Sequence, residues 1–157
     1  MKEAAEIMQN IVEKLEALIA DTSHGNTKRF RHSRSTYEPR DLLDIRSPTR
    51  RFVVMPTGSR ELSNFLGQEG AMTSVIQSFD LAIAFAQGKN AHELYQRIVE
   101  DVDQIGREMM KTANFDSGTT GLENRIVSSY SIEIGSQEGA AALVTIPIEC
   151  RYTPTYA

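Results

Sequence analysis

Apolar residues recur every three or four positions in two stretches of the chain, and each stretch predicts an amphipathic helix. The first helix is predicted over residues 2–20, with acidic residues early, where the helix dipole favours them. The second is predicted over residues 90–112, because Asn90 and Glu93 match a capping box. The apolar stripe of this second helix comprises Ala91, Leu94, Tyr95, Ile98, Val102, Ile105 and Met109.

Alternating apolar and polar positions predict strands in the middle of the chain. From Val75 to Phe85, the side chains at alternate positions are mostly large on one face of the strand and mostly small on the other. This indicates a sheet with one face under a helix and the other lightly covered. A shorter strand is predicted over residues 51–55, ended by the turn that begins at Pro56. A first strand is predicted near residues 28–35, followed by a polar loop through Pro39.

The last third of the chain predicts a hairpin with strands at 126–134 and 142–152 and a turn at 135–139. Pro147 cannot donate to a strand ladder, so the last strand is predicted to lie at an edge, or to turn this nitrogen away from its partner. The order of elements predicts an α+β fold. We expect a mostly antiparallel sheet of four to five strands with two main helices packed on one face.

Length and composition limit the class of protein. A chain of 157 residues fits a single domain, residues 1–157. A net charge of −4 argues against a dedicated nucleic-acid binder, whose footprint is usually basic. The acidic start does not suit a signal peptide, and no apolar run is long enough to predict a membrane span. A soluble protein made in a reducing cytoplasm is therefore expected.

No combination of residues predicts catalysis. Cys150, the single cysteine, lies in an alternating strand and is interpreted as a small buried hydrophobe. His24, His32 and His92 are interpreted as surface histidines, since none shows a metal-ligand spacing. No phosphate-binding glycine loop is found, so neither an enzyme nor a cofactor or metal site is predicted.

Residues 21–51 are unusually basic and are interpreted as a loop or arm. Three interpretations stay open for this segment: a solvated loop, a subunit interface, to which arginine is suited, or a contact with phosphates. The arginines in question are Arg29, Arg31, Arg34, Arg50 and Arg51.

Four segments together resemble the tail terminator proteins of tailed bacteriophages. They are the strand Ser74–Ile83, the acidic helix 90–112, and the strands Ile126–Ile134 and Ala142–Tyr152 close to the terminus. The resemblance covers nearly the whole chain in the order and length of its elements, and rests on strand texture and not on an invariant motif. The basic segment 21–51 is a departure, because it is larger than the family needs.

The resemblance implies a non-enzymatic virion protein that forms a ring, commonly hexameric, on the end of the tail tube. The ring stops tube polymerisation and offers a docking surface to a head-completion or connector protein. Its partners are then copies of itself, the tail tube protein and the connector, with DNA only as cargo through the lumen. The implied location is the neck of the virion, after assembly in the host cytoplasm. The alternatives are another neck or tail-like assembly protein, or a small ligand-binding α+β domain.

A closed ring needs two different patches on each subunit. We hypothesise that the arginines of the basic segment meet acidic residues of the second helix across the subunit boundary. The acidic candidates are Glu93, Glu100, Asp101 and Asp103. In the short aromatic C-terminal segment, Tyr152 and Tyr156 are further candidates for contact with a partner.

Overall fold

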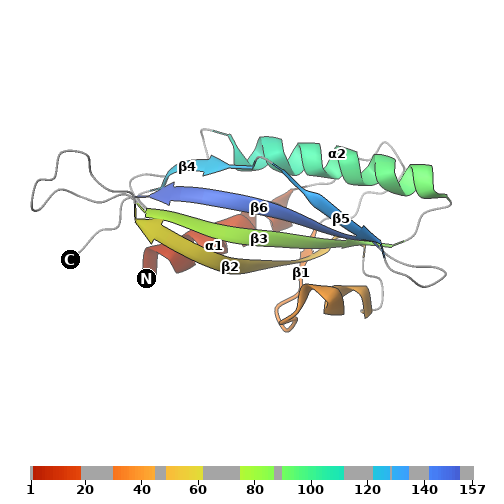
Figure 1. Ribbon diagram of the computed structural model, residues 1–157, viewed down its shortest axis with the longest axis horizontal. Coiled ribbons are helices and arrows are strands. Elements are labelled where there is room, and N and C mark those ends of the chain that lie inside the picture. The colour runs from red at the N-terminus through yellow and green to blue at the C-terminus, as the bar shows by residue number, and fades with distance from the viewer. Residues whose placement is uncertain are drawn as a thin grey trace, which may run out of the picture.

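The computed structural model describes residues 2–18, 30–44, 49–61, 75–86, 90–111, 122–127, 129–134 and 142–152. The elements are α1 (Lys2–Ala17), β1 (Arg31–His32), the 3₁₀ helix η1 (Pro39–Asp44), β2 (Arg51–Glu61), β3 (Val75–Phe85), α2 (Ala91–Met109), β4 (Leu122–Ile126), β5 (Ser131–Ile134) and β6 (Ala142–Tyr152). Both predicted helices are confirmed, and the fold is of the predicted α+β class (Figure 1). η1 lies where the sequence predicts only a polar loop. The predicted turn at 135–139 lies outside the described residues.

The strands form one mixed sheet in the order β1-β2-β3-β6-β4, with β5 also paired to β6. β4 and β5 occupy the same side of β6, one after the other, so the sheet has five positions. Only the short pair β1–β2 is parallel, and the other pairs are antiparallel. The predicted mostly antiparallel sheet is therefore confirmed.

Both helices pack on one face of the sheet and enclose the main core. Asn90 caps α2 as predicted, with its side-chain oxygen accepting a hydrogen bond from the Glu93 N–H at 2.9 Å. The buried apolar side chains of the two helices meet those of β3 and β6. This core includes Ile7, Ile11, Leu15, Phe79, Leu81, Ile83, Phe85, Leu94, Ile98, Ile105, Val144, Ile146 and Ile148.

The opposite face of the sheet is covered more thinly by η1. Leu42 of η1 packs there against Val53, Ala82, Ala84 and Leu143. The small residues of β3 point to this face and its large residues point to the helices, because side chains alternate along a strand. The two faces predicted from the alternation of β3 are thus confirmed.

β2 continues past its predicted end at residue 55. Pro56 pairs with Phe79 and Gly58 with Ser78, so Thr57 is an extra residue that forms a bulge. β1 pairs only with the first two residues of β2, so no described strand lies beyond Pro56 to require its missing N–H. The turn residues therefore bend this strand without ending it, and the predicted end is wrong.

The predicted strand 126–134 is two strands. β4 pairs with the C-terminal end of β6 and β5 with its N-terminal end, so residues 146–148 have no strand partner on this side among the described residues. Pro147 lies in the middle of this gap and is in register with Asp80 of β3. The predicted edge position of β6 is wrong. A proline is accommodated in this central strand because the neighbouring strand is interrupted beside it.

Candidate interaction surface

Two charged residues predicted to form a subunit interface instead meet inside one chain. Arg50 precedes β2, Asp101 lies midway along α2, and each is 1% exposed. Nε of Arg50 donates to Oδ2 of Asp101 at 2.7 Å, and Nη2 donates to Oδ1 at 3.1 Å. This is the bidentate geometry of strong arginine–carboxylate pairs. The hypothesis that these two residues pair across a subunit boundary is therefore wrong.

The surroundings of the pair explain how an arginine comes to be buried. The guanidinium carbon of Arg50 lies 5.8 Å from the centre of the Phe30 ring, a cation–π contact. The backbone of Arg50 has φ of 62°, donates to the Ala84 carbonyl at 2.7 Å and accepts from the Arg31 N–H at 2.9 Å. Arg50 thus links β1 and β3 through its backbone and α2 through its side chain.

Burial raises the pKa of Asp101 above its ordinary 3.8, and the hydrogen bonds and charge of Arg50 oppose this rise. The burial of Asp101 can be predicted from its position along the helix, although not from the apolar residues alone. Asp101 follows Ile98 by three positions and precedes Ile105 by four, so the helical period places it on the buried face of α2.

Tyr152 is also buried, at the end of β6, where it is in register with Val75 on one side and Leu122 on the other. It belongs to the core, so its assignment to an interface is wrong. Arg29 and Tyr156 lie outside the described residues.

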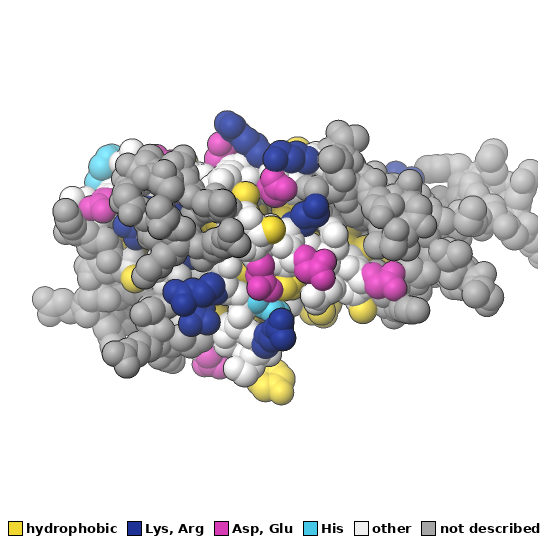
Figure 2. All heavy atoms as spheres, turned by 180° about the vertical axis from the view of Figure 1, so that it is seen from behind, with side chains coloured by type: hydrophobic (Ala, Val, Ile, Leu, Met, Phe, Trp, Pro, Cys, Tyr) yellow, Lys and Arg dark blue, Asp and Glu magenta, His cyan; other side chains and the backbone are white. Residues whose placement is uncertain are grey.

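The remaining candidates do not form one charged patch. They are Arg31, Arg34, Arg51, Glu93, Glu100 and Asp103. On α2, Glu93 pairs with Arg97 at 3.5 Å and Asp103 with Arg107 at 3.0 Å. Figure 2 shows the face behind that of Figure 1, where the described basic and acidic side chains lie interspersed. The described part of this face therefore lacks the basic stripe that contact with phosphates calls for.

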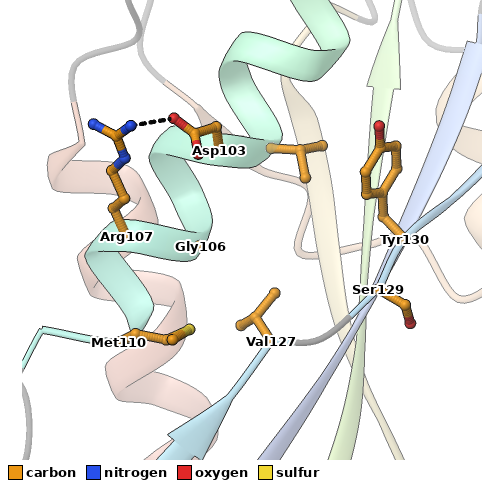
Figure 3. A pocket seen from close by; sticks show the side chains of 8 residues that line it. Asp103, Gly106, Arg107, Met110, Val127, Ser129 and Tyr130 are labelled. Carbon is orange, nitrogen blue, oxygen red and sulfur yellow. Dashed lines mark ion pairs between the residues drawn. The ribbon is translucent and has the colours of Figure 1, made fainter.

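A groove of about 340 Å³ lies between α2 and the chain that links β4 to β5 (Figure 3). It is lined by Val102, Asp103, Gly106, Arg107, Met110, Val127, Ser129 and Tyr130. The interruption between β4 and β5 supplies one wall, and Gly106 leaves open space on the other, since a Cβ placed there meets no atom within 4 Å. The groove was not predicted from the sequence, because the pattern of residues 126–134 predicts an uninterrupted strand at this position.

An apolar stripe on α2 extends the groove along the helix. The stripe consists of Tyr95, Val99, Val102, Gly106 and Met110, which recur at spacings of three and four. Of the large side chains, Tyr95 is 45% exposed and Val99 and Met110 are each 52% exposed. The prediction that Tyr95 belongs to the buried stripe of this helix is wrong. We call the groove and this stripe the α2 surface.

The possible metal ligands among the described residues are not clustered. No group of three or more His, Cys, Asp or Glu among them is placed to hold a metal ion. Cys150 is buried and His92 exposed, as predicted. His32 is half-buried, with its ring centre 5.3 Å from that of Phe52, so its interpretation as a surface histidine is wrong. None of the described helices has the length and apolar character to cross a membrane.

No protein-family model matches this chain, and no curated protein matches it.

Proposed function

We propose that this chain assembles with copies of itself into a closed ring that caps the tail tube of a tailed bacteriophage. The ring stops polymerisation of the tube and offers a docking surface to a head-completion or connector protein. The support is the order of elements, helix, sheet, helix and C-terminal strands, which is the order in the tail terminator proteins that the chain resembles. The role is structural, its place is the neck of the virion, and DNA passes the ring as cargo.

The observation that carries this proposal is the exposed α2 surface. Tyr95, Val99 and Met110 leave about half of each side chain in water, at 45%, 52% and 52% exposure. Covering such side chains is favourable by about 25 cal/mol per Å² of apolar area. Exposed apolar side chains that recur along one helix face favour protein–protein contact. A subunit that functions only within an assembly accounts for it.

The groove is less well suited to a small ligand. Its volume of about 340 Å³ is near the lower end for ligand pockets. Such pockets enclose most of their ligand, whereas Asp103, Met110, Ser129 and Tyr130 on the groove wall are exposed. The apolar surface also continues beyond the groove to Tyr95, farther than a small ligand needs. A protein partner therefore fits better than a ligand.

The test is the native mass of the purified protein, measured by light scattering after gel filtration over a concentration series. We expect a species of about six subunits, each of 17.5 kDa, and annular particles in negative-stain electron micrographs. Adding the ring to polymerising tail tube protein should shorten the tubes. A monomer at every concentration that leaves tube length unchanged would contradict the proposal.

A further inference from the structure

Tyr37 is an aromatic side chain with no cover from the described part of its own chain. It lies between β1 and η1 and is 92% exposed, more than any other large hydrophobic residue described. Tyrosine is among the residues most enriched at the energetic centres of protein interfaces. A tyrosine this exposed on a folded segment is therefore a candidate anchor for a partner.

The segment that carries Tyr37 is held in place on both sides. Before it, the Ser33 N–H donates to the Phe52 carbonyl of β2 at 2.9 Å, and the hydroxyls of Ser33 and Thr36 are 2.6 Å apart. After it, the Asp41 N–H donates to the Glu38 carbonyl at 3.0 Å. An anchor whose backbone is already ordered loses little entropy on binding.

The groove on the α2 surface has the character that a tyrosine side chain needs. Its apolar walls come from Val102, Met110 and Val127, and the space at Gly106 admits a ring (Figure 3). The volume of about 340 Å³ leaves room for one aromatic side chain with its neighbours.

Charges beside the anchor match charges beside the groove. Arg34 and Glu38 flank Tyr37, are four residues apart and are both exposed. Asp103 and Arg107 border the groove and are also four residues apart, paired at 3.0 Å with side chains 59% and 78% exposed. Such an exposed pair is weak, so both partners can exchange it for contacts with another chain.

We propose that Tyr37 of one copy inserts into the groove of a second copy, with Arg34 facing Asp103 and Glu38 facing Arg107. The inference rests on the proposed self-assembly and names the contact that produces it. Tyr37 lies beside η1, which covers one face of the sheet, whereas α2 packs on the other face (Figure 1). Two different patches that face apart form a head-to-tail contact, which closes into a ring when the rotation between subunits allows it.

The first experiment blocks each half of the contact. Tyr37→Ala removes the anchor, and Gly106→Leu fills the groove, with Gly106→Ala as the matched control that adds only a methyl group. A Cβ at Gly106 meets no atom within 4 Å and the larger leucine side chain extends into the open groove, so both helix variants should keep the fold. Circular dichroism and thermal melting check this. We expect Tyr37→Ala and Gly106→Leu to raise the concentration for half-assembly by more than about tenfold, and Gly106→Ala to leave it unchanged.

Mixing the two blocked variants tests the head-to-tail arrangement directly. A Tyr37→Ala chain keeps its groove and a Gly106→Leu chain keeps its anchor, so one intact contact can form between them. We expect two-chain species in the mixture and monomers from each variant alone. Native mass spectrometry with one variant isotopically labelled distinguishes a mixed pair from a pair of identical chains.

A charge exchange tests the register of the contact. Arg34→Asp and Asp103→Arg should each weaken assembly, and the double variant should regain at least part of the loss. Additive losses in the double variant would overturn the pairing of these two residues.

The outcomes separate the inference from the proposed function. Rings that survive both Tyr37→Ala and Gly106→Leu would overturn the inference and leave the ring proposal standing. Loss of assembly only in Gly106→Leu would assign the groove to another occupant and would also overturn it. A wild-type chain that stays monomeric at every concentration would overturn both.

Discussion

Arg50 combines a buried charged side chain with a left-handed backbone at the junction of three elements. Its φ of 62° is uncommon for a residue with a side chain and costs about 1–3 kcal/mol. The side chain of Arg50 is 2% exposed, and no described residue accepts a hydrogen bond from its Nη1. The bidentate contact with Asp101 offsets this arrangement, so the two residues must be considered as one unit.

Removing one member of this pair should therefore be far more damaging than removing both. Asp101→Leu leaves a buried unpaired guanidinium and should lower the free energy of unfolding by about 3–5 kcal/mol. The double variant Arg50→Met, Asp101→Leu should recover most of that loss, because no charge is then left without a partner. Urea denaturation of the three proteins measures this. Equal losses in the single and double variants would show that the unpaired guanidinium is not the cause of the lost stability.

His32 should make the stability of the fold depend on pH. Burial lowers its pKa below the ordinary 6.5, the Glu16 carboxylate opposes this shift, and Arg34 adds to it. The unfolded chain then takes up the proton more readily than the folded one, so the stabilisation is complete above about pH 6.5 and is lost as the pH falls through the lower folded pKa. In His32→Gln the urea midpoint should decline less between pH 7.5 and 5.

Asp101 is present in both wild type and His32→Gln, so the difference between their pH profiles reports the contribution of His32 alone. The raised pKa of Asp101 acts in the opposite direction, stabilising the fold below 3.8 and losing that contribution as the pH rises through the folded pKa. Parallel pH profiles for wild type and His32→Gln would contradict the assignment to His32.

At the scale of elements, local sequence patterns predicted well which helices and strands exist. They predicted poorly how strands far apart in the sequence pair with one another. The Asn90 cap and the two faces of β3 depend on neighbouring residues and were predicted from them. The continuation of β2 through Pro56 and the gap beside Pro147 depend on where other strands end, which no local pattern specifies. The groove could not be predicted for the same reason, since the gap between β4 and β5 forms one of its walls.

The cap of α2 should contribute measurably to stability, because this helix carries both the buried Asp101 and the exposed α2 surface. Asn90→Ala removes the oxygen that accepts from the Glu93 N–H at 2.9 Å and should cost about 1 kcal/mol. Asn90→Asp keeps an acceptor and should cost much less. Thermal denaturation compares the three proteins. An alanine variant as stable as wild type would show that α2 is fixed by packing alone.

At the scale of the whole molecule, the exposed features lie far apart in the sequence and on different faces. Composition could not locate the proposed contact, because Tyr37 and Val99 are ordinary residues until the fold exposes them. Arg50, Asp101 and Tyr152 were assigned to an interface by residue type and are buried instead. Residue type alone is a weak predictor of burial for charged residues, because a charged side chain can be buried when it is paired with an opposite charge.

The balance of apolar and charged contact predicts how assembly responds to salt. If Tyr37 in the groove dominates the proposed contact, raising NaCl from about 0.1 M to 1 M shortens the screening length from about 10 Å to 3 Å and weakens only the flanking pairs. Exposed pairs contribute about 0–1 kcal/mol each, so two of them allow at most about a thirtyfold change in the dissociation constant. Light scattering at the two salt concentrations measures this change in the dissociation constant.

The variants sharpen this prediction. Tyr37→Phe keeps the ring and should assemble with a salt response close to that of wild type, because the Arg34 and Glu38 pairs are untouched. Arg34→Ala with Glu38→Ala should assemble more weakly at low salt and lose most of the salt response. Assembly that vanishes at 1 M NaCl in the wild type would place the main attraction in charges and not in the aromatic anchor, and the contact would then have to be sought among the arginines of residues 30–51.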